Sequence, residues 1–112
     1  MIKSQTIGSV LVLAVEAPRL DAALAVRFRE EMLQHLAEEP GRVVFDFSGV
    51  TFLDSSGLGA LVSVVKRVNH HCKPVLCGLQ PAVRTMFALT RMDKVLQVRG
   101  TVDEAVASLA AE

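Results

Sequence analysis

The alternation of strand-like and helix-like segments is the feature that most limits how this chain can fold. Two β-rich runs, Ile2 to Ile7 and Ser9 to Val15, flank Gly8 and predict a hairpin. After this hairpin, short apolar runs alternate with longer segments whose apolar residues recur every three or four positions. The pattern predicts an α/β fold: a single domain whose mixed, mostly parallel β-sheet is packed by about four helices, with the hairpin as an antiparallel edge.

The individual segments support this pattern. Asp21 precedes a helical stripe and is expected to be its N-cap, while Pro40 and Gly41 end that helix. The nearly continuous apolar run from Arg42 to Phe47 is typical of a buried central strand. Later segments are a helix that begins close to Ser55 or Ser56, a strand Val75 to Cys77, a helix from Pro81, a strand Val95 to Val98 and a helix capped by Thr101 with Glu104.

Bulk properties exclude several classes of protein. A chain of 112 residues has room for one domain, and its 12 Lys and Arg residues balance 12 Asp and Glu residues, so neither a basic nucleic-acid footprint nor an acidic tail is present. The longest apolar run, Val10 to Val15, is far shorter than the ~20 residues of a membrane-spanning helix, and the N-terminus lacks a secretory apolar region. We therefore expect a cytoplasmic protein in which Cys72 and Cys77 are reduced thiols.

The segment from Phe52 to Leu61, FLDSSGLGAL, is the candidate functional site. Ser55 lacks the G-x-S-x-G context of hydrolases and an adjacent base, because His35 lies on the first helix, and His70 and His71 are expected at the far end of the helix that Ser55 begins. Gly57-Leu58-Gly59 lacks the third glycine of a dinucleotide fingerprint and the lysine of a P-loop. We expect no enzymatic activity and no cofactor.

Two interpretations of this polar segment remain open on the residues alone. Asp54, Ser55 and Ser56 are residue types that cap helices, and one of them would suffice for that purpose. Three in succession beside two glycines, in a very apolar region, equally suggest a modification or contact site. The small residues Gly59, Ala60 and Ser63 would then let another backbone come close.

The remaining candidates have simpler explanations. A metal site built from His70, His71, Cys72 and Cys77 fits no familiar zinc spacing, and adjacent helix residues point apart, so we expect no metal. Four of the five phenylalanines, Phe45, Phe47, Phe52 and Phe87, are expected in the core.

The stretch from Asp46 to Leu61, DFSGVTFLDSSGLGAL, closely resembles the signature of STAS domains, and specifically of bacterial anti-sigma factor antagonists. Leu20 to Ala22 resembles the start of the family's first helix, and Gly78 to Val98 resembles its third helix and final strand. The resemblance covers the chain as one STAS domain, residues 1–112. Pro18 departs from the glycine that the family commonly has two residues before the Leu-Asp pair.

The resemblance implies a partner switch in which Ser55 is the phosphorylation site. A serine kinase that is also an anti-sigma factor, with a histidine-kinase-like ATP fold, would modify Ser55, and a serine phosphatase would reverse the modification. The unphosphorylated antagonist would bind the kinase and the phosphorylated one would release it. The positions that match the family's acidic and contact residues are Asp21, Asp54, Ser56, Gly57, Leu58 and Gly59.

Two alternatives stay beside this interpretation. The chain could be a STAS subunit of another complex, such as an accessory of a lipid-transport ATPase, or a small-molecule or nucleotide sensor that uses the region near Ser55. The intact Asp-Ser-Ser-Gly favours the partner switch, because a docking subunit does not require a phosphoacceptor at that position.

Overall fold

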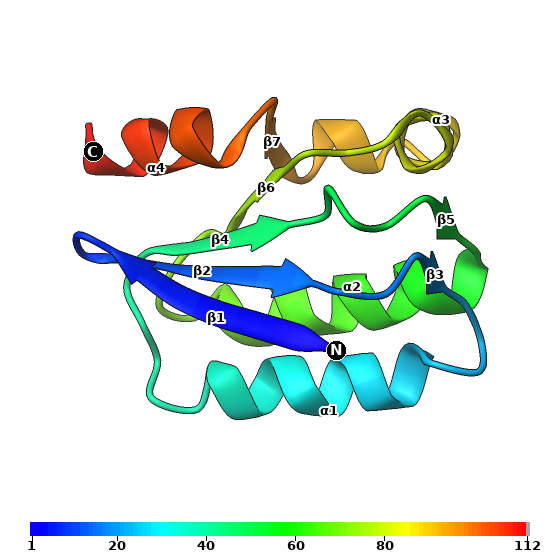
Figure 1. The fold of residues 1–112 in the computed structure, drawn as a ribbon, viewed down its shortest axis with the longest axis horizontal. Helices are drawn as coiled ribbons and strands as arrows, with labels where there is room; N and C mark the ends of the chain where they lie inside the picture. Colours follow the sequence, from blue (N-terminus) through cyan, green and yellow to red (C-terminus); the bar gives the residue numbers. More distant parts are fainter. Residues whose placement is uncertain (112) are drawn as a thin grey trace.

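A computed structural model describes residues 1–111, and its centre is a five-stranded sheet with the order β1-β2-β4-β6-β7 (Figure 1). The strands are β1 (Ile2–Ile7), β2 (Val10–Val15), β4 (Val43–Asp46), β6 (Val75–Cys77) and β7 (Gln97–Arg99). β1 and β2 form an antiparallel hairpin, and every other neighbouring pair is parallel. The predicted mixed sheet with an antiparallel edge is therefore confirmed.

In residues 1–111, four α-helices cover this sheet: α1 (Ala25–His35), α2 (Ser55–Val68), α3 (Pro81–Leu89) and α4 (Val102–Ala110). In Figure 1, α1 and α2 run side by side along one face, and α4 lies on the other. Alternation along the strands gives each face its own core. One row across the sheet joins the main core, which α1, α2 and α3 share: Leu13, Phe45, Leu76 and Val98. The opposite row, which includes Val12, Val44 and Val75, packs with Ala105 and Leu109 of α4.

A second, two-stranded parallel sheet, which the sequence did not predict, joins β3 (Arg19–Leu20) to β5 (Phe52–Leu53). Leu20 and Leu53 are buried partners in this pair. Phe52 is 36% exposed and lies under the guanidinium of Arg19, 4.1 Å from the ring centroid, so its expected place in the core is wrong. The small sheet brings the segments that lead into α1 and α2 together.

Asp21 does not cap α1, contrary to expectation. Its Oδ1 accepts a hydrogen bond from the N–H of Ala23 at 3.1 Å, and its backbone oxygen accepts from Leu24 and Ala25. The chain makes one turn after β3 before the regular helix begins at Ala25, and Asp21 caps that turn. The local chemistry of an Asp cap is present, but it acts one turn earlier.

Three further boundaries differ from the prediction, and the first is the end of α1, which lies at His35 and not at Pro40. α2 ends at Val68 with Asn69 as its C-cap, so His70 and His71 lie in the turn that follows and not on the helix. The last strand begins at Gln97, because a short 3-10 helix, η1 (Met92–Lys94), precedes it and leaves Val95 71% exposed.

Both cysteines are free thiols, and burial together with the nearby Asp46 carboxylate raises the pKa of Cys77 to about 12. Within residues 1–111, no helix combines the length and the apolar character that crossing a membrane requires.

Candidate functional site

The Asp-Ser-Ser-Gly segment forms the start of α2, as predicted. Ser55 and Ser56 are the first two residues of the helix, and both are exposed. Asp54 is the N-cap: its Oδ1 accepts from the N–H of Gly57 at 2.9 Å. One acidic side chain therefore caps the helix, which leaves both serine hydroxyls without a hydrogen bond to any part of residues 1–111.

Asp54 also connects the start of α2 to the turn before α1. Its second carboxylate oxygen, Oδ2, accepts from the N–H of Ala22 at 3.1 Å, and its own N–H donates to the backbone oxygen of Leu20 at 3.4 Å. A single residue thus holds two segments that lie 32 positions apart in the sequence. This is a second role for Asp54 that the sequence pattern alone did not reveal.

A second acidic residue lies on the same turn. Asp21 is next to Ala22, and its carboxylate is 3.7 Å from Nε of Arg19, which is itself stacked on Phe52. The immediate surroundings of the turn thus hold two carboxylates and one guanidinium. Negative charge added at Ser55 would meet favourable N–H groups of the helix start and an unfavourable carboxylate at the neighbouring Asp54.

The two glycines of the segment have different environments. A Cβ atom on Gly57 would lie 2.1 Å from the backbone oxygen of Leu20 and 2.8 Å from a methyl group of Leu53. Gly57 is therefore needed for α2 to approach β3. Gly59 is exposed, and a Cβ there would meet nothing within 4 Å, so the fold of residues 1–111 gives no reason for a glycine at that position.

The other small or apolar residues of this helix face the protein. Leu58 is 9% exposed and belongs to the main core. Ala60 is buried, and the hydroxyl of Ser63 accepts a hydrogen bond from Nε of Arg29 on α1 at 2.8 Å. The side of α2 formed by Ala60 and Ser63 thus receives α1, and Gly59 is the member of that expected contact surface that stays open.

The structure brings no proton acceptor of the imidazole type to Ser55. His35 ends α1, and His70 and His71 follow α2, whose 14 residues span about 21 Å. No group of three or more His, Cys, Asp or Glu side chains within the described chain is placed to hold a metal ion. What the exposed end of α2 offers is two accessible hydroxyls on a rigid, well-capped helix start.

Comparison with known proteins places this arrangement in a family. The family model of the STAS domain matches residues 1–105. An anti-sigma factor antagonist from Mycobacterium paratuberculosis is 25% identical, with a TM-score of 0.87 over 96% of this chain and 92% of that one. The phosphorylated form of the Bacillus cell fate determinant SpoIIAA is 16% identical, with a TM-score of 0.68 over 97% and 99%.

The same fold also occurs inside a larger protein. The murine anion transporter Slc26a9 is 21% identical over 96% of this chain and 19% of the transporter, with a TM-score of 0.82. Likeness at this level of identity concerns the fold. The sheet order, the capped start of α2 and a family model that covers almost the whole sequence agree, and the chain belongs to the STAS domain family.

Proposed function

We propose that this protein is a non-enzymatic, cytoplasmic anti-sigma factor antagonist that switches partners through phosphorylation of Ser55. The observation that carries the proposal is the exposed hydroxyl of Ser55 at the first position of α2, beside the N-cap Asp54. The similarity to an antagonist at 25% identity supports it, as does the existence of a phosphorylated form of SpoIIAA. The partner would be a serine kinase of the histidine-kinase-like ATP fold, and a serine phosphatase would restore the hydroxyl.

The geometry provides a physical basis for a switch that does not unfold the protein. A phosphoryl group adds about −1.5 to −2 charges and would sit at a helix start whose free N–H groups favour anions. The same charge would lie beside Asp54, close to Asp21, on the surface that a partner must touch. A partner that fits a neutral hydroxyl and the open Gly59 would meet bulk and repulsion. A loss of 3–4 kcal/mol would correspond to about a few-hundredfold weaker binding.

The roles proposed for the neighbouring residues follow from their positions. Asp54 holds the helix start and Asp21 holds the adjoining turn. Gly57 lets α2 approach β3, which fixes where Ser55 stands. Ser56 and Gly59 are exposed and would contact the partner directly, whereas Leu58 would act by supporting the helix from the core.

The test compares Ser55→Ala and Ser55→Asp in calorimetric titrations against the kinase that co-purifies with the protein. Ser55→Ala should bind as the unphosphorylated protein does, and Ser55→Asp should bind more weakly, because it places an anion at the interface. The matched controls are Ser4→Ala and Ser4→Asp, at an exposed position of β1 that is not among the proposed contact residues. Thermal melts check that all four variants stay folded.

Two results would contradict the proposal. Equal affinity of folded Ser55→Ala and Ser55→Asp would show that charge at this position does not control the interface. Phosphate located by fragment mass spectrometry on Ser56, after incubation with the kinase and ATP, would show that Ser55 is not the acceptor. Co-purification of a transport ATPase in place of a kinase would support the alternative of a docking subunit.

A further inference from the structure

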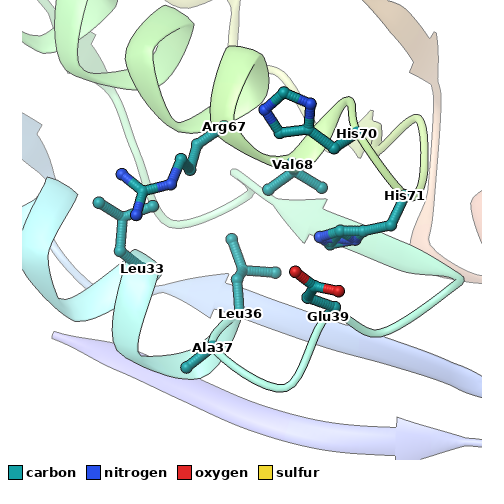
Figure 2. Close-up of a pocket in the computed structure, with 8 residues that line it drawn as sticks. All are labelled: Leu33, Leu36, Ala37, Glu39, Arg67, Val68, His70 and His71. Atoms are coloured by element: carbon teal, nitrogen blue, oxygen red, sulfur yellow. The ribbon is translucent and has the colours of Figure 1, made fainter.

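A pocket of about 270 Å³ lies between the far ends of α1 and α2 (Figure 2). Its apolar floor includes Leu36 and Val68, which are 5% and 1% exposed. Its polar lining consists of Arg67 from the last turn of α2, Glu39 from the loop after α1, and His70 and His71 from the turn after α2. The volume is about nine times the ~30 Å³ that one water occupies in the liquid, so the pocket suits a small molecule.

The polar groups of this pocket have no partners in the described part of the chain. Neither the guanidinium of Arg67 nor the carboxylate of Glu39 forms a side-chain hydrogen bond or ion pair within residues 1–111. Nδ1 of His71 is buried and lacks a hydrogen-bond partner. An unpaired buried polar atom is destabilising by about 1–3 kcal/mol, so a ligand that Nδ1 could reach by a rotation of its ring would relieve that destabilisation.

The backbone of Glu39 adds a separate observation. Its φ is 54°, a left-handed conformation that a residue with a Cβ rarely adopts. The conformation belongs to the turn that ends α1, in which the N–H of Glu39 donates to the backbone oxygen of Leu36 at 3.0 Å. Here the conformation belongs to the residue whose carboxylate lines the pocket.

The charges are arranged with opposite signs at opposite sides. In Figure 2, Arg67 and Glu39 lie on different sides of the pocket, and Leu36 lies between them in this view, with Val68 above. The His71 ring is on the same side as Glu39, so a carboxylate is available there, and a rotation of the ring would turn Nδ1, an acceptor in the neutral imidazole protonated at Nε2, into the pocket. The C-terminal ends of α1 and α2 both lie at this pocket, and the negative ends of both dipoles favour a cation, so Arg67 is the group that offsets them for a ligand carboxylate.

We infer that this pocket binds a short dipolar molecule of the ω-amino acid class. Its carboxylate would pair with Arg67, its ammonium with Glu39 and Nδ1 of His71, and its methylene chain would cover Leu36 and Val68. A net-neutral ligand with separated charges matches a pocket that has a cation on one side and an anion on the other. The site is at the opposite end of α2 from Ser55, so the inference stands apart from the proposed partner switch.

The test uses 5-aminovalerate as the probe, titrated into ¹⁵N-labelled protein while the amide signals of Leu36 and Val68 are followed by NMR. For a ligand of about eight non-hydrogen atoms, a Kd on the order of 1 mM is expected. Valerate lacks the ammonium and pentylamine lacks the carboxylate, and each should bind about tenfold more weakly or worse.

Two substitutions assign the ends of the ligand. Arg67→Gln should weaken 5-aminovalerate and valerate and leave pentylamine unchanged, whereas Glu39→Gln should weaken 5-aminovalerate and pentylamine and leave valerate unchanged. Lys66→Gln and Glu38→Gln are the matched controls, because they neutralise the adjacent exposed charges outside the pocket. Both controls should retain the affinity of the unmodified protein for all three probes.

Three results would overturn the inference. The first is the absence of any shift at Leu36 and Val68 up to about 50 mM probe, well above the expected Kd. The second is binding of valerate or pentylamine by the unmodified protein as tight as that of 5-aminovalerate, which would show that one charge suffices. The third is an equal effect of each substitution and its neighbouring control, which would reduce the binding to general electrostatics.

Discussion

The two ends of the α1–α2 helix pair differ in how their polar side chains are hydrogen-bonded. At the end where both helices begin, Asp54 uses both carboxylate oxygens to hold α2 and the turn before α1, and Asp21 caps that turn. At the end where both helices finish, Nδ1 of His71 is buried without a partner, and the charges of Arg67 and Glu39 face a pocket unpaired. The first end is held by hydrogen bonds around two exposed hydroxyls, and the second leaves a buried nitrogen unpaired beside a pocket.

This difference has an energetic meaning. Where polar groups are already satisfied, removal of one should destabilise the protein, because its partner is left without a bond. Where a group is unsatisfied, replacement with an apolar side chain should stabilise the protein, and any loss should appear in binding. The comparison can therefore be tested by the sign of the change in unfolding free energy at each end.

The largest loss of unfolding free energy is expected for Gly57→Ala, at the end where both helices begin. The new methyl group would overlap the backbone oxygen of Leu20 at 2.1 Å, so α2 would have to move away from β3. We expect the unfolding free energy in urea to fall by about 3 kcal/mol or more. Ser56→Ala, an exposed neighbour, should change it by less than about 0.5 kcal/mol. A stable Gly57→Ala protein would show that this helix start is not tightly held.

Asp54→Ala should have the next largest effect. The substitution removes the N-cap bond to Gly57 and the bond to Ala22 together, so we expect a loss of about 2 kcal/mol in urea denaturation. Asp21→Ala removes one cap bond and an exposed ion pair and should lose about 1 kcal/mol or less. If the two variants are equal, Asp54 does not join the two segments as its contacts indicate.

His71→Leu tests the opposite end and should reverse the sign. Loss of the buried, unpaired Nδ1 should raise the unfolding free energy by about 1 kcal/mol, while removing the acceptor for an ammonium ligand. His70→Leu, at an exposed position, should change stability by less than about 0.5 kcal/mol. A clear destabilisation by His71→Leu alone would mean that Nδ1 is satisfied in solution and that the two ends do not differ.

Gly59→Ala should produce the smallest change in unfolding free energy. It tests whether Gly59, unlike Gly57, has no structural role at the start of α2. A Cβ at this position meets no atom within 4 Å, so alanine should stabilise the helix by about 0.5–1 kcal/mol. If the proposed function holds, the same variant should bind the kinase more weakly, because Gly59 lies on the exposed contact surface. Unchanged binding in calorimetry would remove Gly59 from that surface.

The sequence predicted the parts of the fold that depend on local chemistry. The start of α2 was identifiable because Asp, Ser and Gly have strong preferences at a helix N-terminus. The hairpin at Gly8 was equally local, and there the glycine has a φ of 60°. The parallel order of the sheet followed from the alternation of segments, which restricts the topology.

The parts that depend on contacts distant in sequence were missed. The β3–β5 pair has two residues in each strand, too short for any periodicity, and this pair exposes Phe52 and delays the start of α1 beyond Asp21. The pocket forms because α1 and α2 finish side by side, so residues separated by about thirty positions share it, and no motif records such proximity. His70 and His71 were expected on a helix, whereas they lie in the turn after Val68, and both line the pocket, His70 above Val68 and His71 beside Glu39 in Figure 2.

The position of α4 at the end of the sequence affects what the nascent chain exposes during synthesis. Among the helices of residues 1–111, it is the one that covers the row of the sheet that holds Val12, Val44 and Val75, and it follows the strands in the sequence. During synthesis each new parallel strand can add to the edge left by the previous one. The outer face of that growing sheet stays apolar and uncovered until residues 102–110 leave the ribosome. A nascent chain stalled just before this helix should therefore be a substrate for chaperones that recognise exposed aliphatic surface.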